Sequence, residues 1–281
     1  MYEAHWGLSE KPFENTPDPK FIYYSEQHRE ALSRLLYVVQ EHKAAALLSG
    51  EYGSGKTLLS RVLLQELKKE NHFKVVSIYN PRLSSLEFIR EIVYQLDGEG
   101  ENLTGKIDLL HLLEKLLLSN NKSGKHIVVL IDEAQAISDS DIFEELRLLL
   151  NFQLDNAYLL TIILIGQPEL IERVVNMPQL KQRISVKFHL RALDEAETKG
   201  YIQQRLKVSG VAGEIFEEES YKQLYICSGG IPREINNLAD LALLAGFSAG
   251  LRRINKELVL RASEDMQLLS PSKEEKKENG R

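Results

Sequence analysis

The chain has 281 residues, of which 43% are hydrophobic and 27% are charged, as in a globular protein with a sizeable core. Its net charge of −6 provides no overall basic field for nucleic-acid binding, and its single cysteine, Cys227, excludes an intramolecular disulfide. Apolar runs of about five to eight residues are far shorter than the ~20 residues of a membrane-spanning helix. We therefore expect a cytoplasmic protein without a transmembrane segment, built from one large domain and a smaller one.

The first two thirds of the chain alternate between segments with helical periodicity and short apolar runs typical of buried strands. In chain order the sequence predicts helix 27–43, strand 44–49, helix 56–70, strand 73–78, helices 84–97 and 106–119, strand 127–131, helix 139–150, strand 159–165, a shorter helix at about 168–176 and strand 184–190. Strands separated by helices predict an α/β fold, with a parallel sheet sandwiched between helices. Ligands of such sheets bind at the carboxyl ends of the strands.

The strand signal ends at about residue 191, and the segments that follow are all helical in pattern. They cover residues 194–208, 217–227, 233–248 and 255–268. We therefore predict an α/β domain over 1–190, in which 1–26 form an N-terminal segment, and a C-terminal all-helical lid domain over 191–268. The polar and charged residues 269–281 have no apolar anchor and are expected to be a disordered tail.

A glycine-rich segment lies between strand 44–49 and helix 56–70. It matches the P-loop pattern, and its glycines allow successive N–H groups to point at phosphate oxygens at a helix N-terminus. Lys56 would reach the β- and γ-phosphates, and the Thr57 hydroxyl would be a ligand of Mg²⁺. The expected contacts to ATP are Gly50, Glu51, Tyr52, Gly53, Ser54, Gly55, Lys56, Thr57 and Leu58.

Two acidic residues follow the wholly apolar strand 127–131, at the edge of the sheet where the P-loop also lies. A buried carboxylate is costly without a cation, so Asp132 is expected to hold the water shell of Mg²⁺, while Glu133 polarises the attacking water. The alternative is an acidic helix cap. Because a kinase has less use for an activated water, Glu133 favours hydrolysis over phosphoryl transfer to another substrate.

Several further stretches carry a family resemblance that covers about residues 1–268. They are His5-Trp6-Gly7-Leu8, Lys11-Pro12-Phe13, Thr16-Pro17-Asp18-Pro19, Gly166-Gln167-Pro168-Glu169-Leu170 and Gly229-Gly230-Ile231-Pro232-Arg233. With the P-loop and the acid pair, these stretches resemble the AAA+ ATPases, and more closely the ExeA type of the general secretion pathway. The longer secretion members continue beyond this ATPase module into a membrane-spanning segment and a periplasmic region.

The resemblance implies roles for three more residues, each with a plainer alternative. Gln167 would sense the γ-phosphate and orient water, or cap the next helix. Arg183 would act in trans as an arginine finger, or form an intrachain salt bridge. Arg233 would contact the γ-phosphate from the lid, or be a surface residue at a helix start. The resemblance also places Tyr23 and Tyr24 beside the adenine, although core packing explains them as well.

The resemblance implies that Mg-ATP binding and hydrolysis are coupled to a conformational change. We expect a homo-oligomeric ATPase that serves the assembly of a secretion, pilus or exopolysaccharide apparatus, with an envelope protein as partner. Such a partner could place the protein at the inner membrane. The alternative is a nucleotide-gated DNA-binding adaptor of the transposition-associated type, which the acidic net charge disfavours.

Overall fold

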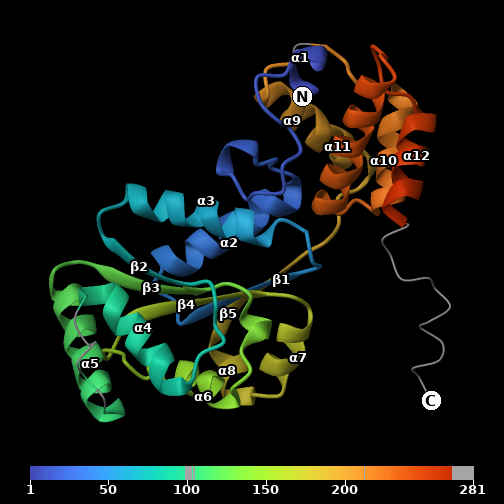
Figure 1. Ribbon diagram of the computed structural model, residues 1–281. Coiled ribbons are helices and arrows are strands. Elements are labelled where there is room, and N and C mark those ends of the chain that lie inside the picture. The colour runs from blue at the N-terminus through green and yellow to red at the C-terminus, as the bar shows by residue number, and fades with distance from the viewer. Residues whose placement is uncertain (99–102, 104, 212, 268–281) are drawn as a thin grey trace, which may run out of the picture. The chain divides into compact units, whose positions relative to one another are not determined.

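The computed structural model describes residues 1–98, 103, 105–211 and 213–267, and its elements are labelled in Figure 1. By its contacts the chain divides into two units. The sheet unit comprises Glu26–Tyr52 and Lys56–Arg191, and the helical unit comprises Met1–Ser25, Gly53–Gly55 and Ala192–Arg281. The expected tail, 269–281, lies outside the described residues.

A five-stranded parallel sheet, in the order β2-β3-β4-β1-β5, forms the middle of the sheet unit. Its strands are β1 Ala45–Gly50, β2 Phe73–Ile78, β3 His126–Ile131, β4 Leu160–Gly166 and β5 Ile184–Leu190. The three central strands are buried along their whole length, whereas the edge strand β5 is buried only at its two end residues and is exposed or partly exposed between them. All five predicted strands are present, and the predicted α/β class is correct.

Helices cover both faces of this sheet (Figure 1). On one face lie α2 Glu26–Gln40 and α3 Lys56–Lys69, and on the other lie α4 Ser85–Asp97, α5 Lys106–Lys122, α6 Ser140–Leu149, α7 Glu169–Val175 and α8 Pro178–Arg183. Helices α4 to α8 share one continuous apolar core with the sheet. The six-residue helix α8 was not predicted, because it is too short to show a helical period.

The helical unit contains α1 Glu3–Trp6, the short 3₁₀ turn η1 Pro19–Phe21 and the helices α9 Glu195–Val208, α10 Glu218–Ser228, α11 Pro232–Ser248 and α12 Lys256–Gln267. Its core includes Tyr2, Trp6 and Phe13 from the N-terminal segment. The Trp6 Nε1 donates to the Leu243 carbonyl at 3.0 Å. The expectation that the N-terminal segment belongs to the α/β domain was therefore wrong, because its aromatic residues are buried among α9 and α11.

A buried arginine fastens this N-terminal segment to α9. Arg205 is 3% exposed and donates to the backbone carbonyls of Pro12 and Glu14 and to the Tyr201 hydroxyl. Its guanidinium also lies 4.7 Å from the ring centroid of Phe21. A buried charge is tolerated only with such partners. Tyr23 packs nearby, since a Cβ added to Gly200 would lie 2.5 Å from the Tyr23 hydroxyl. Core packing therefore accounts for Tyr23.

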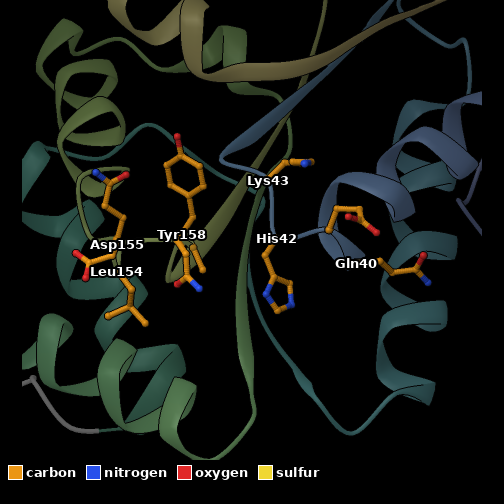
Figure 2. A pocket seen from close by; sticks show the side chains of 10 residues that line it. Gln40, His42, Lys43, Leu154, Asp155 and Tyr158 are labelled. Carbon is orange, nitrogen blue, oxygen red and sulfur yellow. The ribbon is translucent and has the colours of Figure 1, made fainter.

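A hollow opens in the sheet unit near the amino-terminal ends of β1 and β4 (Figure 2). Gln40, His42 and Lys43 line one side of it, and the loop 153–158 lines the other. The His42 ring, which lines this hollow, stacks on the buried His126 ring, with centroids 3.9 Å apart and planes 2° from parallel. Burial is the main cause that lowers the pKa of both rings, that of His126 to about 3, so the stacked pair is neutral at pH 7.

Candidate functional site

The P-loop leaves β1 at Gly50 and enters α3 at Lys56, as the sequence predicted. Gly53 and Gly55 have φ values of +81° and +97°, a backbone region that only glycine adopts readily. The three residues Gly53–Gly55 belong by their contacts to the helical unit. Within that unit a Cβ added to Gly53 would lie 2.7 Å from the Arg233 Cβ, so this close approach requires glycine.

The Lys56 side chain lies inside the loop and is only 6% exposed. Its Nζ donates to the carbonyl oxygens of Gly50 and Glu51, both at 2.8 Å. The ammonium group is therefore buried against the backbone of the loop, where it would meet any phosphate that the loop holds. A cation in a poorly hydrated position interacts more strongly with an anion than a surface lysine does.

Asp132 follows β3 and is 2% exposed. Its Oδ1 accepts a hydrogen bond from the Glu133 N–H at 2.9 Å, and the Thr57 hydroxyl is hydrogen-bonded to the same carboxylate. Burial raises the pKa of Asp132, while these two hydrogen bonds and the charge of Lys56 act in the opposite direction. The structure thus brings the P-loop and the acid pair together.

These oxygen donors fit a magnesium ion. The Asp132 carboxylate and the Thr57 hydroxyl are hard ligands of the kind that Mg²⁺ prefers, and a buried carboxylate with a raised pKa gains from a nearby cation. Asp132 directly follows β3, and Thr57 is the second residue of α3. They were the two metal ligands predicted from the sequence.

Glu133 adopts a left-handed backbone conformation, with φ 52° and ψ 36°. This conformation is uncommon for a residue other than glycine and often occurs where function requires a fixed geometry. It precedes the short 3₁₀ turn η2, Ala134–Ala136. The Glu133 carboxylate accepts a hydrogen bond from the Gln135 Nε2, so its position is held by a side chain two residues further along.

Gln167, the predicted sensor, follows β4 in the sheet unit. Its backbone N–H donates to the Gln135 Oε1 at 3.0 Å. The ends of β3 and β4 are therefore joined through the Gln135 amide. Glu133 and Gln167 belong to separate sequence motifs, and both are hydrogen-bonded to this one side chain.

The two predicted arginines lie in different units. Arg183 ends α8 in the sheet unit, where its Nη2 donates to the Asn151 Oδ1 at 2.6 Å, and its Nη1 is buried without a hydrogen-bond partner among the described residues. This partner is an amide, and not the carboxylate that the alternative of an intrachain salt bridge requires. Arg233 is the second residue of α11 in the helical unit, and its N–H donates to the Gly53 carbonyl at 3.3 Å.

Comparison with known proteins identifies the family. An AAA domain matches residues 39–174. General secretion pathway protein A of Aeromonas hydrophila is 40% identical over 257 residues, which cover 90% of this chain and 46% of that protein. The chain belongs to the ExeA type of AAA+ ATPases. It spans less than half the length of the curated relatives it matches, among them Origin recognition complex subunit 5 of Drosophila melanogaster, which is 24% identical over 219 residues.

Solved structures with low sequence identity share the fold of this ExeA-type chain. The CDC6P protein of Pyrobaculum aerophilum, 17% identical, superposes with a TM-score of 0.70 and covers 88% of this chain and 70% of its own. The ORC2 protein of Aeropyrum pernix, 18% identical, has a TM-score of 0.67 and covers 94% and 75%. At these identities the likeness concerns the fold alone. Within the described part of the chain, no helix is both long and apolar enough to cross a membrane.

Gln135 is the site residue of this ExeA-type chain that the sequence analysis missed. An uncharged amide in a short turn produces no periodicity and no charge pattern. The available signal was its position two residues after Glu133, at the end of a strand that carries the acid pair. Arg173 on α7 was missed as well, although its Nη1 donates to the Gln135 carbonyl at 3.0 Å and also to the Ile137 carbonyl.

Proposed function

We propose that this protein binds Mg-ATP in the P-loop and hydrolyses it. The observation that carries the proposal is the meeting of Thr57 and Lys56 with the buried Asp132 carboxylate. A hydroxyl, a cation and a carboxylate in one poorly hydrated place form the set of groups that a metal–triphosphate complex needs. The A. pernix ORC2 structure of the same fold contains ADPNP and ADP, which supports the choice of nucleotide for this chain.

The residues divide the reaction between them. The N–H groups of the loop and Lys56 bind the phosphates, while Thr57 and Asp132 would hold Mg²⁺, which when bound neutralises charge on the phosphate oxygens. Glu133 accepts a proton from the attacking water and so directs it towards the γ-phosphorus. The buried surroundings of Asp132 keep competing water away from its carboxylate.

Replacement of Lys56 tests nucleotide binding. Lys56→Ala should weaken binding of a fluorescent ATP analogue at least ~10-fold, because charge-assisted hydrogen bonds are worth about 1.5–3 kcal/mol each. Lys69→Ala is the matched control, since Lys69 ends the same helix but its side chain is 67% exposed. Titration beside circular dichroism decides the matter. A folded Lys56→Ala protein that keeps the affinity of the control contradicts the proposed site.

Arg233 is proposed to read the γ-phosphate from the helical unit. Its place at the start of α11 puts a cation at the positive end of a helix, which a bound anion would stabilise. Arg233→Ala should reduce the preference for ATP over ADP more than it reduces affinity for both. Gln167 is proposed to orient water with its amide, and loss of turnover with retained binding in Gln167→Ala is the corresponding measurement.

Arg183 is proposed to act in trans in an ATP-dependent homo-oligomer. A guanidinium beside a neighbour's triphosphate stabilises charge that develops during transfer, by about 10³–10⁵ in rate. Mixing Arg183→Ala with Glu133→Gln should restore activity, because each mutant retains the group that the other lacks. A mixture no more active than the sum of its parts, with assembly verified by light scattering, leaves Arg183 as a structural partner of Asn151.

The biological role is proposed from the relative's name, General secretion pathway protein A. Coupling of hydrolysis to a conformational change would serve assembly of a secretion, pilus or exopolysaccharide apparatus, with a cytoplasmic protein held at the inner membrane through a partner. Co-purification with envelope proteins tests this role.

The DNA-binding adaptor is the second candidate, and the fold of an A. pernix ORC1 protein in complex with DNA is the observation that favours it. A salt-dependent, ATP-dependent mobility shift of DNA would support that role instead.

A further inference from the structure

Both ends of the Gln135 amide form hydrogen bonds, one to a residue after β3 and one to a residue after β4. Its Nε2 donates to the Glu133 carboxylate, and its Oε1 accepts the Gln167 N–H at 3.0 Å. Because one end of an amide only donates and the other only accepts, these two partners fix which way the group points. The side chain therefore links a carboxylate after β3 to the main chain after β4.

Gly166 makes room for this link. A Cβ added there would lie 2.6 Å from the Gln135 Oε1, 2.8 Å from the Leu170 Cδ2 and 3.3 Å from the Gln135 backbone nitrogen. The backbone of Gly166 lies outside the left-handed region, so glycine is required here for space and not for its conformation. A glycine as the last residue of β4 therefore leaves the space that the Gln135 amide occupies.

Arg173 holds the turn that carries Gln135. Its Nη1 donates to the carbonyl oxygens of Gln135 and Ile137, and its guanidinium carbon lies 4.9 Å from the ring centroid of Phe143. The backbone of the turn is therefore bound to α7 as well as to β3. A side chain on such a fixed turn has little freedom to swing away from Glu133.

We propose that Gln135 is a positioning residue for hydrolysis, an inference that rests on the proposed function. Its amide holds one oxygen of the Glu133 carboxylate and leaves the other to accept the proton of the attacking water. Through Gln167 it also ties that carboxylate to the segment proposed to sense the γ-phosphate. Fixed orientation matters because a displacement of about 1 Å of a reacting group lowers rates by as much as ~10²-fold.

Two replacements of Gln135 separate orientation from packing. Gln135→Glu keeps an oxygen acceptor for the Gln167 N–H but loses the donor to Glu133, and Gln135→Ala loses both. Each should lower kcat by about 10–100-fold while the affinity for a fluorescent ATP analogue changes by less than about threefold, the pattern of an interaction that acts in the transition state. Circular dichroism shows whether the variants are folded.

Gly166 supplies an independent route to the same group. Gly166→Ala should push the amide away and lower kcat, whereas Gly213→Ala should not, because a Cβ added there meets no atom of the described residues within 4 Å. In a Gln135→Ala background the effect of Gly166→Ala should shrink, because the shortest of its contacts, with the Gln135 Oε1, is gone, while those with the Leu170 Cδ2 and the backbone nitrogen of residue 135 remain.

The outcomes separate this inference from the proposed function. Full kcat in folded Gln135→Ala, or equal effects of Gly166→Ala in both backgrounds, overturns the inference and leaves hydrolysis intact. A wild-type chain that shows no turnover at saturating Mg-ATP over a range of protein concentrations overturns the proposed hydrolysis and the role of Gln135 with it.

Discussion

The two ends of the parallel sheet bury polar groups in opposite ways. At the amino end, burial lowers the pKa of His126 to about 3, and the neutral ring bonds Thr161 through its Nε2 at 2.8 Å. At the carboxyl end, burial raises the pKa of Asp132, but the Thr57 hydrogen bond and the charge of Lys56 oppose it. The ring at the amino end is neutral, although its Nδ1 is buried without a hydrogen-bond partner among the described residues. The carboxyl end instead gathers charged groups that suit a charged ligand.

Backbone strain alone does not separate these two ends. Among the described residues, the non-glycine residues with positive φ are His42, at 47°, and Glu133, at 52°. His42 follows α2 and stacks on His126, while Glu133 follows β3 and accepts a hydrogen bond from the Gln135 side chain. The difference that points to function is therefore the set of charged neighbours, and the strain acquires meaning only beside them.

The largest expected effect is on turnover at the carboxyl end. Glu133→Gln should bind ATP with wild-type affinity yet release phosphate at least ~100-fold more slowly, because general-base catalysis is worth about 10²–10⁴. His126→Gln, the same kind of change at the opposite end, should leave turnover within about twofold. Phosphate release measured for both variants checks the comparison. Near wild-type turnover in Glu133→Gln removes this residue from the mechanism.

Sequence patterns predicted which residues lie together at the carboxyl end, but not how their side chains are connected. The P-loop and the acid pair have spacings imposed by phosphate and metal chemistry, so Lys56, Thr57 and Asp132 could be assigned together before any contact was known. Gln135 could not, because its partners are a carboxylate in its own turn and an N–H on another strand. Such a pairing depends on β3 lying next to β4.

The N-terminal segment illustrates a second limit of sequence patterns. Trp6 and Phe13 are clearly candidates for burial, but an apolar residue in a segment without periodicity does not say which core it joins. The decisive contacts are with α9 and α11, far along the chain, including the carbonyl groups that Arg205 binds. Arg205 occupies an ordinary position in a predicted helix, so no sequence pattern indicated that its side chain is buried.

The second expected effect is a pH dependence of stability that originates at the amino end. Folding lowers the pKa of His126 from its ordinary value of 6.5 to about 3. Below pH 6.5 this histidine is therefore protonated in the unfolded chain but remains neutral in the folded chain. Stability therefore falls as pH drops, by about 2 kcal/mol between pH 6.5 and 5 at 1.36 kcal/mol per unit. Asp132, with a raised pKa, contributes the opposite sign, since its protonation favours the folded chain.

Urea unfolding at pH 7 and pH 5 isolates this contribution. Between pH 7 and pH 5 the free energy of unfolding of wild type should fall by about 2 kcal/mol more than that of His126→Gln. The slope of the unfolding free energy against urea concentration should be the same in both proteins. Equal losses in the two proteins would show that His126 does not titrate differently on unfolding.

The smallest expected effect compares the two strained residues directly. A left-handed conformation costs an L-residue roughly 1–2 kcal/mol and costs glycine little. Glu133→Gly should therefore unfold at a higher urea concentration than Glu133→Ala, by about 1 kcal/mol in stability, and both should be inactive. The pair His42→Gly and His42→Ala should show the same difference, because both variants lose the stack on His126 and differ only in the backbone.

The position of wild type relative to each pair then distinguishes the two ends. At His42 the wild-type ring adds the contact with His126, so wild type should be more stable than either variant. At Glu133 the side chain contributes one hydrogen bond to Gln135 in a half-buried place, so Glu133→Gly should be at least as stable as wild type. A Glu133→Gly protein clearly less stable than wild type would mean that the Glu133 side chain stabilises the fold. The strained residues at both ends of the sheet would then have the same structural role.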